Sequence, residues 1–214
     1  MNYKLVFIDD NMREGLEHPF VRAIGKKRKE AELSVFIDPS KGLDYVLNNL
    51  NSKMIVFLDY KFDGYSLQGI NVLKEIRKHT SLLYIVMMSA NSINQIAGLD
   101  ILEMINEDYI WFFDRNNGTI DDACKLIDKI NILWNVRFDC ILENWIIKHP
   151  DDANKKVFSQ PGQEESYTWE RILVELRKQT PIGKMFEKLI NQFYIYNLTS
   201  KSEQNAKDNN SIQQ

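Results

Sequence analysis

Five short, continuous apolar segments constrain the fold of this chain more than any other feature. They read KLVFI (4–8), LSVFI (33–37), MIVFL (54–58), YIVMM (84–88) and YIWFF (109–113). None of them alternates polar with apolar residues, which is typical of strands that are covered on both faces, as parallel strands are. The segments therefore predict a buried parallel sheet.

Helical patterns lie between these strands. After the second strand, Leu43, Val46, Leu47 and Leu50 recur at helical spacing, and Ser40 is the expected N-cap. Similar patterns follow the third and fourth strands, and residues 12–30 are expected to form the first helix. Strands that alternate with helices imply right-handed crossovers, so we predict an α/β fold with a doubly wound sheet. Its expected strand order is 2-1-3-4-5, the flavodoxin-like arrangement.

The sequence after the fifth strand predicts an α-helical extension. Apolar residues recur from Ile120 to Trp145, and one continuous helix of this length would span roughly 40 Å, more than the sheet needs. A polar connector (149–166) and two helices follow; Thr180 and Pro181 suit the start of the second. Almost no apolar residue follows Thr199, so we expect disorder there. We therefore expect the chain to divide into a sheet-containing domain (1–135), a region with the extended helix, the linker and the later helices (136–198), and a disordered tail (199–214).

Composition narrows the classes of function. The net charge is -3, so the chain lacks the basic excess typical of nucleic-acid binding, and we expect no DNA partner. No apolar run approaches the roughly 20 residues of a membrane span, and Asp9 interrupts the first run too early for a signal peptide. Cys124 and Cys140 fall among apolar helical positions and predict buried thiols in a reducing cytoplasm.

Acidic residues stand at the carboxyl ends of two strands. Asp9 and Asp10 follow the first strand, Asp59 follows the third, and Ser89 follows the fourth. Strands one and three are neighbours in the expected sheet, so the three carboxylates should converge at the edge where ligands bind. Converging carboxylates need a cation, and Mg²⁺ prefers oxygen ligands. A carboxylate beside Mg²⁺ can act as a nucleophile toward phosphorus.

The combination of LVFIDDN, VFLDY, GINVLKEIR and IVMMSA over about residues 3–135 resembles the receiver domain of two-component response regulators. The resemblance implies that Asp59 accepts a phosphoryl group from a sensor histidine kinase. It implies that Asp9, Asp10, Asp59 and the backbone carbonyl of Lys61 hold Mg²⁺, and that Ser89 hydrogen-bonds the phosphoryl group. An aromatic residue of the fifth strand, Trp111 or Phe112, would report the state of the switch.

One position departs from the pattern of that family. Receiver domains carry a lysine at the end of the fifth strand, and the best candidate here is Arg115. Arginine keeps the positive charge but presents a planar fork of donors instead of a compact ammonium. Three outcomes stay open: Arg115 replaces the lysine, the switch is weakened, or the domain no longer responds normally.

Two alternatives to a phosphoacceptor switch follow from the residues. A degenerate receiver would keep the acidic pocket and act only as an interaction scaffold. A phosphatase of the haloacid dehalogenase type needs a second Asp two places after its nucleophile, but Asn11 and Lys61 stand at those places. We expect a switch and not a turnover enzyme. The C-terminal helices, or the last receiver helix, would mediate protein–protein contact such as homodimerisation.

Overall fold

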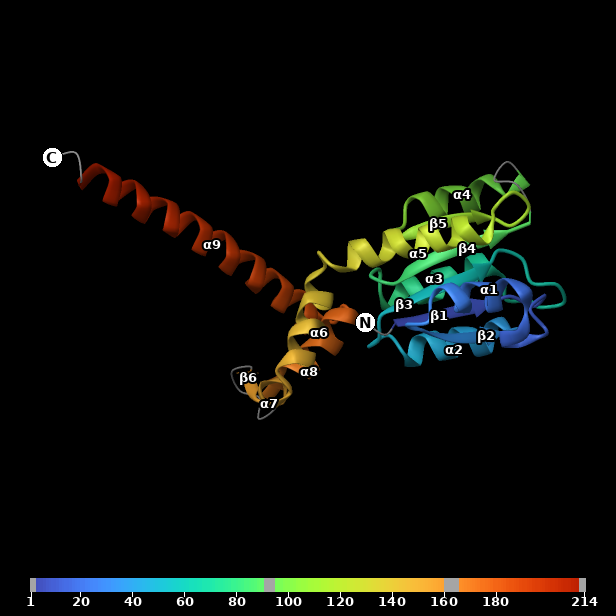
Figure 1. The fold of residues 1–214 in the computed structure, drawn as a ribbon, viewed down its shortest axis with the longest axis horizontal. Coiled ribbons are helices and arrows are strands. Elements are labelled where there is room, and N and C mark those ends of the chain that lie inside the picture. The colour runs from blue at the N-terminus through green and yellow to red at the C-terminus, as the bar shows by residue number, and fades with distance from the viewer. Residues whose placement is uncertain (1–2, 91–94, 160–165, 212–214) are drawn as a thin grey trace. The chain divides into compact units, whose positions relative to one another are not determined.

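The computed structural model describes residues 3–90, 95–159 and 166–211. The chain divides into two compact units, Met1–Trp145 and Ile146–Gln214. The first unit contains the sheet, and the second consists of short strands and helices (Figure 1). The candidate site lies in the first unit.

The first unit is built on a five-stranded sheet. Its strands are β1 (Tyr3–Ile8), β2 (Ala31–Phe36), β3 (Met54–Asp59), β4 (Tyr84–Ser89) and β5 (Ile110–Asp114). Neighbouring strands pair in parallel, and their order is β2-β1-β3-β4-β5. The predicted α/β class and the order 2-1-3-4-5 are therefore confirmed. Every residue of β3 and β4 is buried, as their continuous apolar sequences predicted.

Helices cover both faces of this sheet. Helices α1 (Pro19–Lys27) and α5 (Ile120–Trp134) pack on one face, while α2 (Pro39–Asn48), α3 (Gly69–His79) and α4 (Gly98–Ile105) pack on the other (Figure 1). Successive residues of a strand point to opposite faces. Phe7 and Phe57 thus belong to the α1/α5 core, and Ile8 and Leu58 to the other core.

Two helix starts differ from the sequence prediction. The N-cap of α2 is Asp38, not Ser40, because the Asp38 carboxylate accepts hydrogen bonds from the backbone N–H groups of Ser40 and Lys41. The expected first helix (12–30) is also shorter. It consists of a 3₁₀ turn, η1 (Gly15–Glu17), and of α1, which begins at Pro19 because proline suits the first helical position.

The single long helix expected from Ile120 to Trp145 is wrong. Helix α5 ends at Trp134, and α6 (Phe138–Lys148) begins after a break. Arg137 stabilises this break: its guanidinium donates to the Leu82 carbonyl (2.6 Å) and to Asp139 (3.0 Å). These contacts tie Arg137 to the segment that leads into β4 and to the first turn of α6, and they favour a turn of the chain over continuation of the helix.

The first unit extends to Trp145, within α6. Most of α6 belongs to this unit. Lys53 and Glu143 form an ion pair of 2.7 Å in which the lysine is almost fully buried. This pair joins α6 to the residue that precedes β3. Both predicted thiols, Cys124 in α5 and Cys140 in α6, are buried, as expected.

The second unit contains more structure than the expected polar connector and two helices. Helix α7 (Pro150–Ala153) precedes an antiparallel pair, β6 (Lys156–Ser159) and β7 (Ser166–Thr168), and helices α8 (Trp169–Arg177) and α9 (Pro181–Ser211) follow. The ring of Phe186 contacts Phe158 and Trp169. Helices α8 and α9 approach closely, since a Cβ at Gly183 would collide with the backbone of Glu175.

The end of the chain differs from the expected disorder after Thr199. Helix α9 begins at Pro181, as predicted, and the Thr180 hydroxyl accepts a hydrogen bond from the Gly183 N–H. The helix continues to Ser211. Each residue added to an existing helix gains one backbone hydrogen bond, so a helix can extend without an apolar face. Residues 212–214 lie outside the described residues.

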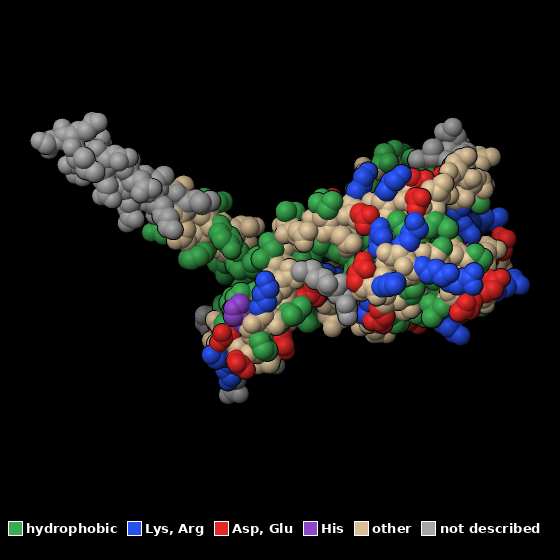
Figure 2. Space-filling model, in the orientation of Figure 1, with side chains coloured by type: hydrophobic (Ala, Val, Ile, Leu, Met, Phe, Trp, Pro, Cys, Tyr) green, Lys and Arg blue, Asp and Glu red, His purple; other side chains and the backbone are tan. Residues whose placement is uncertain are grey.

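The surface is mixed in charge. Lys and Arg side chains intermingle with Asp and Glu side chains over the visible face of the first unit (Figure 2). Within the described residues, no helix has the length and apolar content that crossing a membrane would require.

Candidate functional site

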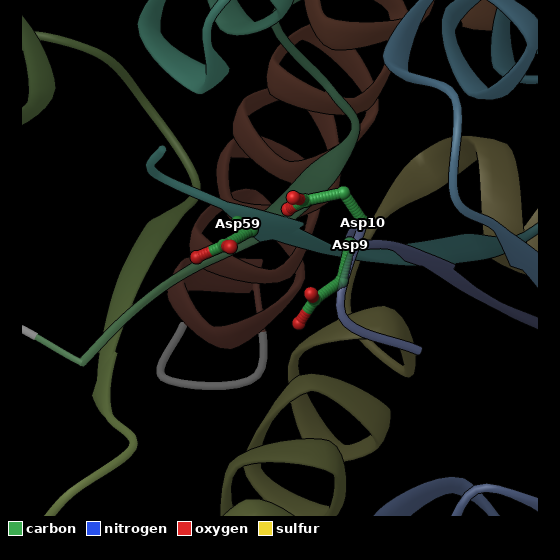
Figure 3. Close-up of side chains that lie close together, drawn as sticks. All are labelled: Asp9, Asp10 and Asp59. Atoms are coloured by element: carbon green, nitrogen blue, oxygen red, sulfur yellow. The ribbon is translucent and has the colours of Figure 1, made fainter. Parts of the chain in front are cut away.

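The parallel pairing of β1 with β3 positions the three acidic residues. Ile8 is opposite Leu58 in this pair, so both strands end at the same edge of the sheet. Asp9 and Asp10 follow β1, and Asp59 is the last residue of β3 (Figure 3). Each carboxylate offers one oxygen, and these oxygens all lie within 4.8 Å of one another. The predicted convergence of Asp9, Asp10 and Asp59 is therefore found.

The three carboxylates are largely removed from water. Asp9 is fully buried, and Asp10 and Asp59 are 8% and 6% exposed. Burial is the main cause that raises the pKa of Asp59 to about 7, and the neighbouring charge of Asp9 raises it further. Burial also raises the pKa of Asp9, against the opposing influence of Arg115. The site therefore favours a proton, or a cation, close to these oxygens.

Backbone N–H groups hold two of the carboxylates in place. The Asn11 N–H donates to Oδ1 of Asp9 at 2.8 Å, and the Asp63 N–H donates to Oδ2 of Asp10 at 3.1 Å. The loop after β3 is itself fixed by Gln68, whose side chain bonds the backbone of Phe62. The acidic residues are thus oriented before any ligand binds.

Arg115 supplies positive charge to the site. Its backbone N–H donates to the Ser89 carbonyl at 2.8 Å, which continues the pairing of β4 with β5. Its Nη1 donates to Oδ2 of Asp9 at 2.6 Å and lies 3.7 Å from Oδ2 of Asp59. The sequence placed Arg115 near the site but did not predict that Asp9 would be its nearer partner.

A cavity of about 580 Å³ opens beside Asp59. Ser89 lies in its wall and is 2% exposed, while Lys61 is exposed and pairs with Asp63 at 3.6 Å. Of the three acidic residues, Asp59 lines this cavity, whereas Asp9 and Asp10 are not among its lining residues. The lining residues are Asn11, Asp59, Lys61, Asp63, Ser89, Ala90, Arg115 and Asn116.

The chemistry of the donors fits a hard divalent cation. The three convergent ligands are all carboxylate oxygens, and Mg²⁺ binds such oxygens at about 2.1 Å while retaining several waters. The adjoining cavity gives room for those waters and for a phosphoryl group. Among the described residues, Asp9, Asp10 and Asp59 are the acidic cluster whose spacing suits an ion.

Sequence reasoning missed two contacts near the site. The Tyr60 hydroxyl donates to Asp100 at 2.7 Å and so connects the residue after Asp59 to α4. The Asn116 side chain donates to the Ala90 carbonyl and joins the loops after β4 and β5. Tyr60 and Asn116 each follow a predicted site residue directly, and this adjacency was the available signal.

The two aromatic residues expected to report the state of the switch, Trp111 and Phe112, lie on opposite faces of β5.

No family model matches the chain, and no curated protein matches it. Solved receiver domains match its fold, among them one from Clostridium thermocellum (20% identity, 61% of this chain and 98% of that chain, TM-score 0.44). Another is the isolated RcsB receiver domain of Salmonella enterica serovar Typhimurium, solved with the phosphomimetic BeF3⁻ (18% identity, 61% of this chain and 89% of that chain, TM-score 0.47).

A third match is a fusion protein that carries a yeast Spc42 trimeric coiled-coil segment (12% identity, 70% of this chain and 92% of that chain, TM-score 0.50). The receiver domains cover about three fifths of this chain. These matches are similarities of fold at low sequence identity.

Proposed function

We propose that the first unit is a phosphoacceptor switch of the response-regulator type, in which Asp59 accepts a phosphoryl group in the presence of Mg²⁺. One observation carries this proposal. Asp59 borders the open cavity, and Asp9 and Asp10 each place a carboxylate oxygen within 4.8 Å of an Asp59 oxygen. A carboxylate in this position can react with a phosphorus centre while its neighbours hold a cation.

The chain offers a complete set of oxygen ligands for Mg²⁺. The carboxylates of Asp9, Asp10 and Asp59 would hold the ion, together with the backbone carbonyl of Lys61. When bound, Mg²⁺ offsets the negative charge of the carboxylates and of the phosphoryl oxygens. The Asp59 carboxylate is then available in its ionised form at neutral pH, although in the absence of the ion burial and the charge of Asp9 raise its pKa to about 7.

The transfer step uses groups that border the cavity. An Asp59 oxygen attacks the phosphorus, and the bond between phosphorus and the imidazole nitrogen of a sensor histidine kinase breaks. The bonding electron pair leaves with that nitrogen. The Ser89 hydroxyl would donate to a phosphoryl oxygen, and Arg115 would supply positive charge in place of the usual lysine.

The output follows from the charge gained at Asp59. Phosphorylation of other side chains adds about -1.5 to -2 at neutral pH, and Ser89 and Arg115 would respond to such a charge. The loops after β4 and β5 would reorganise, and α5 would pass the change to the C-terminal region. We infer that this region (136–198) binds protein, through a partner or through a second copy of the chain. Such a protein is a cytoplasmic signalling switch and not a turnover enzyme.

A specific observation also favours a second candidate, the unswitched interaction scaffold. Arg115 already pairs with Asp9 at 2.6 Å. A site that is neutralised internally in this way could retain its acidic residues without taking up a phosphoryl group.

Fluorescence of Trp111 separates the two candidates. Trp111 is partly buried in β5, three residues before the last residue of that strand. In the switch, beryllofluoride with Mg²⁺ changes the emission, and the change is absent without Mg²⁺, in Asp59→Asn and in Trp111→Phe. The last variant is needed because Trp134, Trp145 and Trp169 also emit. An unchanged emission of the wild type at saturating beryllofluoride and Mg²⁺ would favour the scaffold.

A further inference from the structure

The last helix of the second unit extends well past the helix that it packs against. Helix α9 has 31 residues and α8 has 9, so α9 continues beyond the part that α8 can cover (Figure 1). The first turns of α9 are packed inside the unit. There Gly183 lies against the backbone of Glu175, and the ring of Phe186 contacts two other aromatic rings of the unit. The later turns project from this packed part.

An exposed apolar run lies on the projecting part of α9. It consists of four consecutive residues, Phe193 (66% exposed), Tyr194 (57%), Ile195 (64%) and Tyr196 (69%). Leu189, which is 47% exposed, lies one turn earlier on the same face as Phe193 and Tyr196. These five residues together expose on the order of 600 Å², because a single aromatic side chain carries about 150–250 Å². An exposed apolar patch of this size marks an interaction site.

The apolar run surrounds the helix instead of forming a narrow stripe. Each residue of a helix is rotated by about 100° from the one before, so four consecutive residues point in all directions. A helix that is apolar all round belongs in the interior of a packed assembly. Nearby polar side chains bond their own helix, since Asn197 donates to the Phe193 carbonyl at 2.8 Å and Thr199 donates to the Ile195 carbonyl at 3.0 Å. The run therefore offers a partner chiefly apolar contact.

The lack of charge in this segment selects a second copy of the chain as the partner. Residues 189–199 read LINQFYIYNLT and contain no Asp, Glu, Lys or Arg. In a two-fold contact the same segment of each copy meets the other, so a charge there would meet a like charge. A different protein would be selected by complementary charge, which this segment does not offer. A lipid surface would select a helix with Lys and Arg beside its apolar residues.

We propose that two copies of the chain associate through α9, with Phe193 at the centre of a symmetric contact between the two helices. A standard interface buries about 800 Å² on each partner. The apolar run is smaller than this, so the dimer dissociates on dilution. The proposal rests on the inference that the C-terminal region binds protein, and it names the partner. It requires neither Mg²⁺ nor a phosphoryl group on Asp59.

Sedimentation equilibrium of the full chain over a wide range of concentration tests the association. We expect a reversible dimer of the wild type. Phe193→Glu places two like charges in the contact and should raise the dissociation constant by about tenfold or more. The matched control is Ile147→Glu, the same kind of change at a residue of α6 in the same unit that is 67% exposed. It should associate like the wild type, and both variants should keep the helix content of the wild type by circular dichroism.

A mixture of two oppositely charged variants tests whether the copies meet at Phe193. Phe193→Lys should weaken self-association as Phe193→Glu does. An equimolar mixture of the two variants should regain association, because the charges in the contact are then complementary. A variant that had lost its fold would not be rescued in this way, and a mixture that stays monomeric would contradict the symmetric contact.

A wild type that is monomeric at every concentration would overturn the proposal, as would a dimer that Phe193→Glu leaves unchanged. A monomer that co-sediments with vesicles of phosphatidylserine and phosphatidylcholine would also overturn it and would assign the run to a lipid surface. Asp59→Asn should self-associate like the wild type. Failure of phosphorylation therefore leaves the dimer standing, and a monomer that gains a phosphoryl group leaves the proposed switch standing.

Discussion

Asp59 and Asp9 are buried carboxylates at the ends of neighbouring parallel strands, and each places an oxygen within 4.8 Å of the other. Burial and the charge of Asp9 together raise the pKa of Asp59 to about 7, from an ordinary value of 3.8. Without a cation, this arrangement opposes folding whenever both groups are ionised.

The raised pKa of Asp59 predicts how stability depends on pH in metal-free protein. Between about pH 4 and pH 7 the folded chain retains a proton on Asp59 that the unfolded chain loses. The free energy of unfolding should therefore fall as the pH rises through this window. Asp59→Asn removes this dependence and should stabilise the protein at pH 7.5 by on the order of 2 to 4 kcal/mol, with little effect at pH 4.5.

Urea denaturation at several pH values, in the presence of a chelator, checks this expectation. Saturating Mg²⁺ at pH 7.5 should stabilise the wild type but not Asp59→Asn, because the variant lacks one ligand. Parallel pH profiles for the wild type and Asp59→Asn would show that Asp59 titrates normally.

The start of α3 controls the position of Asp59. A Cβ at Gly69 would collide with the backbone carbonyl of Asp59 and would lie 2.9 Å from the Cα of Tyr60. Because backbone atoms cannot move aside cheaply, Gly69→Ala should lower the free energy of unfolding by about 2 kcal/mol or more. It should also weaken Mg²⁺ binding, since Asp59 must shift.

Gly98 provides the matched control for this substitution. It is the first residue of α4, as Gly69 is the first residue of α3. Among the described residues, apart from its chain neighbours and the backbone of its own helix, no atom lies within 4 Å of its added Cβ. Gly98→Ala should leave stability unchanged or slightly raised. Chemical denaturation compares the two, and an equal loss in both variants would refute the role of close packing at Gly69.

The hydrogen bond from Tyr60 to Asp100 connects the acidic site to α4. Tyr60→Phe removes the hydroxyl that donates to Asp100 at 2.7 Å, and we expect a loss of about 1 kcal/mol. Amide hydrogen exchange in α4 should accelerate, because this helix loses a tie to β3. Tyr194→Phe, at an exposed tyrosine of α9, is the control; unchanged exchange in α4 of Tyr60→Phe would contradict the proposed link.

The strands could be predicted because each one leaves a local signal. Leu5 to Ile8 and Ile55 to Leu58 are fully buried in adjacent strands, and burial on both faces demands a continuous apolar run. The acidic residues at the strand ends followed from the same reasoning, since pairing of β1 with β3 fixes which ends meet. The sheet order and the convergence of Asp9, Asp10 and Asp59 were thus accessible from sequence.

Contacts between distant polar residues could not be predicted in the same way. Arg115 reaches Asp9 across more than one hundred residues of chain, and no periodic pattern encodes the choice between Asp9 and Asp59. The break after Trp134 depends on Arg137, which bonds the Leu82 carbonyl. Apolar spacing continues across that break and predicts a helix, because it cannot register a tertiary contact that turns the chain.

The antiparallel pair of the second unit was missed because its strands are short and half polar. Strand β6 is exposed at three of its four residues, and β7 has three residues. Phe158 and Tyr167 supply the apolar contact between them. Segments this short fall below the length at which alternation can be recognised in a sequence.

The mass of the protein after incubation with acetyl phosphate tests the central claim most directly. We expect the full chain to gain the mass of one phosphoryl group in the presence of Mg²⁺, and to gain none with a chelator or in Asp59→Asn. An unmodified wild type with Mg²⁺ bound, or an equal gain in Asp59→Asn, would contradict the assignment of Asp59 as the phosphoacceptor.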